Sequence, residues 1–115
     1  MVTQKPLRRS TPRYALARVR ELAGQEEVSY ASSRVQYDTD GLGYSFEEVC
    51  RCLSQLEDTD FQHSEQYADS GIWLDVYLLK YEAPNGAIDD LYIKLKLNRN
   101  CICVVLCSFH QERDI

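Results

Sequence analysis

Two histidines, one tyrosine and a row of lysines are the side chains of this sequence best suited to chemistry on a phosphodiester. His63 and His110 are its only histidines, and imidazole gains or loses a proton near neutral pH. Tyr92, Lys94 and Lys96 alternate, so they project from one side if they lie on a strand. A lysine can stabilise the extra negative charge of a phosphorane-like transition state, and a tyrosine can stack on a base. These residue types are suited to cutting RNA without a metal, with His63, His110, Tyr92 and Lys94 as the catalytic candidates.

Polar residues of the last apolar segment extend this set. Ser108 and His110 share a face of a predicted strand, and short connections would bring that face beside Tyr92 and Lys94. Ser108 and Lys96 are therefore expected to bind RNA. His63 is placed in a loop just ahead of the first long strand. The alternative interpretation is that each residue is an ordinary side chain on a solvated sheet face.

Other catalytic patterns are absent from the sequence. It contains no glycine-rich phosphate loop, no H-E-x-x-H pair and no G-x-S-x-G elbow. The acidic pairs Asp89-Asp90 and Asp58-x-Asp60 fall at expected turns, where such pairs usually face solvent. We therefore expect neither a cofactor nor a metal.

The cysteines do not form a metal-binding or disulfide pattern. Their odd number, without an export signal, does not indicate a disulfide framework. One pair is two residues apart on a predicted helix and points to different sides. The other three share one face of a predicted strand, which is typical of a core. We expect all five to be reduced and free of metal: Cys50, Cys52, Cys101, Cys103 and Cys107.

Charge is distributed unevenly along a chain whose net charge is −5. The first twenty residues contain only basic charges, acidic residues dominate from 37 to 90, and the segment 91–99 is basic again. The local field matters more to a polyanion than the total charge does. Arg13, on an exposed face of the first predicted helix, is therefore a further candidate for binding RNA.

Hydropathy indicates a protein of the cytoplasm with no membrane partner. The sequence has no apolar run of about 18 residues. Its basic N-terminus is not followed by an apolar stretch of signal-peptide length.

The N-terminal half predicts helices. Residues 1–9 lack apolar periodicity and predict a mobile basic arm, ahead of a single domain at 10–115. The first helix is expected to start at Ser10 or Thr11 as N-cap, with Pro12 in its first turn, and to end at Gly24. The range 26–44 is ambiguous, with a short strand at 28–30 and one or two helical turns at 33–39 as its expected elements. A second helix is predicted at 45–56 from the capping box of Ser45 and Glu48.

The C-terminal half predicts strands, because the apolar period changes from 3.6 to 2. Strands are expected at 72–81, 91–97 and 101–109, joined by short turns that favour an antiparallel meander. The fold class is therefore α+β, with N-terminal helices packed on a curled antiparallel sheet.

Six blocks spread over residues 10–110 form a recognisable pattern: Thr11-Pro12, Leu42-Gly43-x-x-Phe46-x-x-Val49-Cys50, Leu56-x-x-x-Asp60-Phe61, Ile72-Trp73-x-Asp75-Val76-Tyr77, Leu91-Tyr92-Ile93-Lys94 and Val105-x-x-Ser108-Phe109. These blocks resemble the MqsR toxins of bacterial type II toxin–antitoxin systems, and W-x-D-V-Y is the most specific of them. The resemblance implies a RelE-like α+β fold, endoribonuclease activity on messenger RNA, and a sequestering antitoxin similar to MqsA. Any contact with DNA would be made only through that antitoxin.

The family's site residues carry over unevenly. The resemblance implies a lysine where this chain has His63, a glutamine where it has Leu74, a tyrosine matched by Tyr92, and a basic residue matched by His110. The enzyme hypothesis gives the two histidines acid–base work. The competing hypothesis, favoured by Leu74, is a degenerate toxin that binds an antitoxin or another protein at a sheet edge without cutting RNA.

Overall fold

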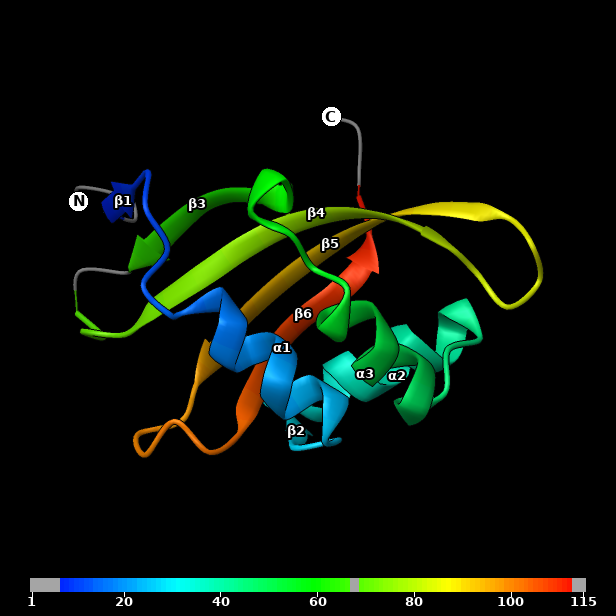
Figure 1. The fold of residues 1–115 in the computed structure, drawn as a ribbon, viewed down its shortest axis with the longest axis horizontal. Coiled ribbons are helices and arrows are strands. Elements are labelled where there is room, and N and C mark those ends of the chain that lie inside the picture. The colour runs from blue at the N-terminus through cyan, green and yellow to red at the C-terminus, as the bar shows by residue number, and fades with distance from the viewer. Residues whose placement is uncertain (1–6, 67–68, 113–115) are drawn as a thin grey trace, which may run out of the picture.

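The protein is an α+β structure in which the helices precede the central strands of one sheet (Figure 1). The computed structural model describes residues 7–66 and 69–112. Its elements are β1 (Leu7–Arg9), α1 (Leu16–Gly24), β2 (Val28–Tyr30), α2 (Ser33–Leu42), α3 (Phe46–Ser54), the 3₁₀ turn η1 (Asp58–Asp60), β3 (Phe61–Gln66), β4 (Trp73–Glu82), β5 (Ile88–Leu97) and β6 (Val104–Gln111). The predicted fold class is confirmed.

The strand order in the sheet is β1-β3-β4-β5-β6-β2. Neighbours along β3, β4, β5 and β6 are antiparallel, which confirms the predicted meander. The sheet is mixed rather than wholly antiparallel, because β2 runs parallel to β6 at the edge. The predicted short strand at 28–30 is present, and the helical turns expected at 33–39 extend to Leu42 as α2.

The last strand begins later than predicted because Asn98 organises a turn before it. The Asn98 carboxamide oxygen accepts hydrogen bonds from the amides of Ile102 and Cys103, at 2.9 and 3.1 Å. Cys101 lies in this turn with a positive φ of 55° and is exposed. The prediction that Cys101 and Cys103 share a strand face with Cys107 is therefore wrong.

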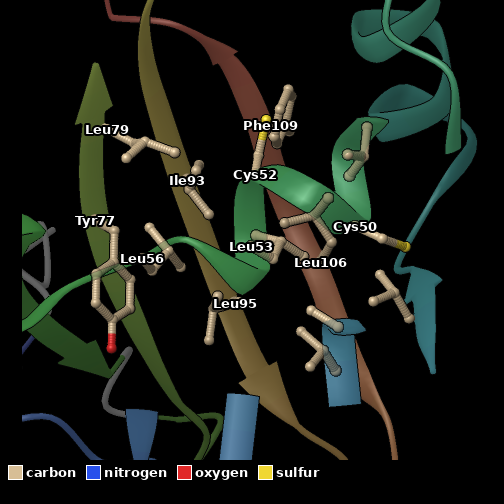
Figure 2. Packing of buried hydrophobic residues seen from close by; sticks show 14 of the residues in the cluster. Cys50, Cys52, Leu53, Leu56, Tyr77, Leu79, Ile93, Leu95, Leu106 and Phe109 are labelled. Carbon is tan, nitrogen blue, oxygen red and sulfur yellow. The ribbon is translucent and has the colours of Figure 1, made fainter. Parts of the chain in front are cut away.

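The core lies between the helices and one face of the sheet (Figure 2). Helix α3 contributes Cys52 and Leu53, and Leu56 just beyond it is also fully buried. They meet inward residues of the central strands such as Ile93 and Leu106 (Figure 2). The burial alternation predicted for 91–97 is confirmed.

Half of the predicted capping box is present at the start of α3. The Ser45 hydroxyl accepts a hydrogen bond from the Glu48 amide at 3.1 Å. The Glu48 carboxylate instead accepts from the Tyr81 hydroxyl at 2.8 Å and pairs with Arg51. Burial raises the pKa of Tyr81 to about 12, so this phenol stays a donor that ties α3 to β4.

Helix α1 begins at Leu16, not at the predicted Thr11-Pro12 position. The cause is Asp75, which is 0% exposed in β4. Its carboxylate accepts hydrogen bonds from the backbone amides of Arg13 and Tyr14, both at 3.0 Å. A buried carboxylate without such donors would be strongly destabilising, so the sheet holds this segment out of a helix.

The expected N-terminal arm is ordered at its end. Residues 7–9 form β1, which pairs antiparallel with β3, and the Arg9 guanidinium lies over the Trp73 ring at 5.6 Å. Residues 7–9 of the expected arm therefore form a strand of the sheet, and residues 1–6 lie outside the described residues.

We predict that Asp75→Asn lowers the free energy of unfolding by about 2–3 kcal/mol, because an amide side chain cannot accept from both backbone donors as a carboxylate does. Denaturant titration measures the loss. Asp90→Asn is the matched control: its side chain is 56% exposed and pairs with Lys80, so the change should stay within about 0.5 kcal/mol. Equal unfolding midpoints for the two variants would contradict the anchoring role.

Candidate active site

A β-bulge at the start of β3 turns His63 away from the core. Phe61 pairs with Tyr77, whereas His63, two residues later, pairs with Val76. The Phe61 ring packs edge-on against Tyr77 at 5.5 Å between centroids, on the core side. Residues two apart on a regular strand share a face, so the extra residue Gln62 puts His63 on the opposite face. His63 therefore lies on a strand, and its predicted place in a loop is wrong.

The 3₁₀ turn before β3 fixes where this bulge falls. The Asp60 carboxylate accepts a hydrogen bond from the Glu57 amide at 2.8 Å, and the Asp60 amide bonds back to the Glu57 carbonyl at 2.9 Å. This closed turn places Phe61 so that its ring packs against the core. The Asp60-Phe61 block thus helps to position His63 on β3.

A second bulge acts on β6. Lys94 pairs with Ser108 and Leu95 with Leu106, so Cys107 is the extra residue. Leu106 is 0% exposed in the core, and Ser108 faces the other way, beside Lys94. The predicted shared face of Ser108 and His110 is confirmed.

Five side chains follow one another across the sheet face opposite the core, and we call them the site row: His63, Glu65, Lys94, Tyr92 and His110. The Glu65 carboxylate joins the first three, since one oxygen lies 2.8 Å from His63 Nε2 and the other 3.0 Å from Lys94 Nζ. Lys94 Nζ lies 5.8 Å from the Tyr92 ring centroid. The Tyr92 and His110 rings stack at 5.0 Å with an interplanar angle of 10°. All four predicted catalytic candidates therefore belong to one chain of contacts.

The remaining RNA-binding candidates differ in their relation to the row. Ser108 pairs with Lys94, and Lys96 follows on the same face of β5. Lys96 makes no ion pair with a described residue. Arg13 is not brought to the row: its backbone bonds to Asp75 on the core side, and its guanidinium lies over Tyr14 at 5.3 Å.

Glu65 is the member of the row that the sequence reasoning missed. It is 5% exposed and reaches across β4 to Lys94. Its signal in the sequence is the spacing His63-x-Glu65, which puts both residues on one face once 61–66 is a strand. Leu74 is the β4 residue directly opposite Glu65.

Hydrogen bonds set the charge state of the Glu65–Lys94 pair. Burial alone would raise the pKa of Glu65, but hydrogen bonds from His63 and Lys94 more than offset it and hold the pKa below its ordinary value. Burial opposes the charged form of Lys94, and the bond to Glu65 prevails and raises its pKa. Both groups are therefore charged at neutral pH.

The same bonds fix the tautomers of the histidines. A carboxylate and a carbonyl can only accept, so His63 Nε2–H donates to Glu65, and His110 Nδ1–H donates to the Gln111 carbonyl at 2.8 Å. The nitrogens left to exchange protons with a ligand are Nδ1 of His63 and Nε2 of His110.

No metal-ligand cluster is found within residues 7–66 and 69–112, because no three His, Cys, Asp or Glu side chains converge there as metal ligands do. Cys50 and Cys52 are buried in the core.

No helix within the same two ranges has the length and apolar character needed to cross a bilayer.

Comparison with known proteins identifies the class as a bacterial toxin. The family model described as "Motility quorum-sensing regulator, toxin of MqsA" matches residues 11–111, and the chain belongs to this MqsR toxin family. It is similar to the "mRNA interferase toxin MqsR" of Escherichia coli (strain K12), with 27% identity over 107 residues that cover 92% of this chain and 100% of that protein.

We predict that Glu65→Gln destabilises the fold by about 1–3 kcal/mol at pH 7, because Lys94 and His63 lose a charged acceptor. The pKa of Glu65 lies below its ordinary 4.5 in the folded state, so its stabilisation is present above that value and is lost as pH falls through the folded pKa. The stability gap between wild type and variant should therefore shrink on acidification.

Chemical denaturation at pH 7 and pH 3 measures this gap. Glu82→Gln, at an exposed position at the end of β4, is the control and should match wild type at both values. A Glu65→Gln gap of the same size at both pH values would show that the carboxylate charge is irrelevant.

Proposed function

We propose that the chain is the toxin of a type II toxin–antitoxin pair and acts as a metal-independent endoribonuclease on messenger RNA. Membership of the toxin family and the mRNA interferase activity named for the Escherichia coli relative support the class. The observation that carries the proposal is the Glu65 carboxylate, which holds His63 and Lys94 together on the sheet face that also carries Tyr92 and His110.

The scissile phosphate would lie over Lys94, with one histidine on each side. On the β3 side, His63 is linked to Lys94 by the Glu65 carboxylate, whose oxygens lie 2.8 Å from His63 Nε2 and 3.0 Å from Lys94 Nζ. His110 approaches from β6, with its ring stacked on Tyr92. An in-line displacement needs its proton acceptor and proton donor on opposite sides of the phosphorus, and this arrangement supplies both.

Charge balance assigns the two roles. Glu65 and Lys94 together carry no net charge, so the cluster attracts a phosphate more strongly with His63 in its protonated form. His63 is therefore the proton donor and His110 the acceptor. His110 Nε2 takes the proton of the 2′-hydroxyl as its oxygen bonds to phosphorus, the bond from phosphorus to the 5′-oxygen breaks, and His63 Nδ1 protonates that oxygen. The products are a 2′,3′-cyclic phosphate and a 5′-hydroxyl.

Lys94 and Tyr92 would act on charge and position. The Lys94 ammonium faces the non-bridging oxygens, whose negative charge grows in the transition state. The Tyr92 ring stacks on the His110 imidazole and fixes the plane of that ring. Rotation of the imidazole out of the reactive geometry is thereby restricted. Ser108, opposite Lys94, offers a hydroxyl to the same phosphate.

An antitoxin similar to MqsA is the proposed protein partner, with any contact to DNA made through it. The edge strands β1 and β2 lie at opposite ends of the sheet, and each leaves backbone groups on its outer side that a partner strand could pair with.

The second candidate function is binding without cleavage, and Leu74 favours it. Leu74 stands opposite Glu65, beside the row, and a leucine can neither donate nor accept a hydrogen bond. Induced expression separates the two: a ribonuclease arrests growth, whereas a binding module does not.

We predict a bell-shaped dependence of the cleavage rate on pH, because one imidazole must be neutral and the other protonated. His110→Ala should remove the acidic limb and His63→Ala the alkaline limb. Each should lower the rate by roughly two to four orders of magnitude. The assay is single-turnover cleavage of a long RNA in EDTA, with thermal melts to verify folding.

Gln62→Ala is the matched control for the histidine variants, since Gln62 is exposed beside His63 and should cut at the wild-type rate. Folded histidine variants that also cut at the wild-type rate would eliminate the acid–base scheme.

We predict that Lys96→Ala reduces the salt dependence of RNA binding. Each phosphate neutralised on a single strand contributes about −0.7 to the slope of log K against log salt, so removing one cation that lies along the strand should flatten the slope by up to about that amount. Lys80→Ala is the control, because Lys80 lies 3.0 Å from Asp90 with a side chain 79% exposed. Identical slopes for both variants would place the phosphate contacts elsewhere.

A further inference from the structure

An apolar pocket of about 410 Å³ opens beside the site row. Ile72, Leu74, Val105 and Cys107 contribute to its wall together with Lys96. Its volume falls within the range of roughly 300–1,000 Å³ found for small-molecule sites. Ala31 and Ser70 complete the wall, and mostly apolar side chains with a single cation form an environment for a flat group that has apolar faces and a polar edge.

Strand neighbours of the row line the pocket. Lys96 follows Lys94 by two residues on β5, a step of about 7 Å along the strand. Leu74 stands opposite Glu65, and Cys107 is the bulged residue next to Ser108. Burial raises the pKa of Cys107, and the charges of Lys96 and Lys94 act in the lowering direction.

We propose that this pocket binds the base of a nucleotide next to the scissile phosphate, an inference that rests on the proposed ribonuclease function. With a phosphate over Lys94, the step to Lys96 is comparable to the reach from a phosphate to its own base. The base faces then lie against Leu74 and Val105, and Lys96 Nζ donates to an acceptor atom on the base edge. The selectivity of this site comes from shape and from one ammonium donor.

The occupant is a nucleobase rather than an apolar peptide side chain because of Lys96. This ammonium has no ion-pair partner in the described part of the chain, and an aliphatic side chain in the pocket would cover it without offering an acceptor. Every nucleobase carries acceptor atoms at its edge. Lys94, the neighbouring cation of the row, also matches the phosphate next to that base.

Cys107 gives a direct test, because its thiol lies in the pocket whereas that of Cys101 is exposed in a turn outside it. The experiment follows alkylation of both thiols by iodoacetamide in the intact protein, read by peptide mass spectrometry. The probe is a short 2′-O-methyl RNA, which cannot be cut. At a probe concentration about ten times its Kd, Cys107 should react about tenfold more slowly, and Cys101 should react at an unchanged rate.

An abasic oligonucleotide of the same length separates base from backbone. Loss of Cys107 protection with the abasic probe is the expected result. Equal protection by both probes, or protection by neither, overturns the proposal. Since the probe is not cleaved, protection in a protein that fails to cut RNA would reject the proposed function alone, and cleavage without protection would reject the pocket alone.

A pair of variants gives an independent measurement. Val105→Trp fills the pocket and should weaken binding of the 2′-O-methyl RNA while leaving binding of the abasic probe unchanged. Ile102→Trp is the control, because Ile102 is 54% exposed outside the pocket wall, and both affinities should stay at wild-type values. Unchanged affinity of folded Val105→Trp for the 2′-O-methyl RNA overturns the proposal.

Discussion

The face of the sheet on which each polar side chain emerges is the constraint on which the site depends. Two bulges set it, one at Gln62 and one at Cys107. A strand residue shifted by one position changes face, so without the bulges His63 would share the face of Phe61, and Ser108 that of Leu106. The core and the site row are therefore linked. The same two bulges that keep Phe61 and Leu106 on the core face place His63 and Ser108, two positions later, on the opposite face.

Within the row, Glu65 sets the charge state of Lys94 and the tautomer of His63. A buried lysine without a partner would tend to lose its charge, and a buried carboxylate without donors would tend to gain a proton. Together they remain ionised and hold the ring of His63 in one tautomer. The carboxylate also cancels the charge of Lys94, so the pair carries no net charge.

The sequence predicts those features that depend on local periodicity. The alternation at 91–97 predicts β5 and its outward-facing lysines, and the apolar face of 45–56 predicts α3, because both patterns arise from a regular repeat. Sequence reasoning does not identify partners that are distant along the chain. Thr11-Pro12 has the chemistry of a helix start, but the backbone amides of Arg13 and Tyr14 donate hydrogen bonds to the carboxylate of Asp75, more than sixty residues away, and the helix starts later. A bulge likewise interrupts the period of two along a strand. Sequence reasoning therefore places His63 in a loop and misses Glu65.

The contact between Arg9 and Trp73 makes the edge strand spectroscopically visible. Trp73 is the single tryptophan of the chain, it starts β4, and the guanidinium of a β1 residue lies over its ring at 5.6 Å. Indole emission responds to a nearby cation and to the entry of water, so the fluorescence of the unlabelled protein reports whether β1 is docked. A partner that displaces β1 changes that emission, whereas a ligand confined to the far end of the row, at Tyr92 and His110, leaves it unaltered. One optical signal thus distinguishes occupation of the sheet edge from occupation of its open face.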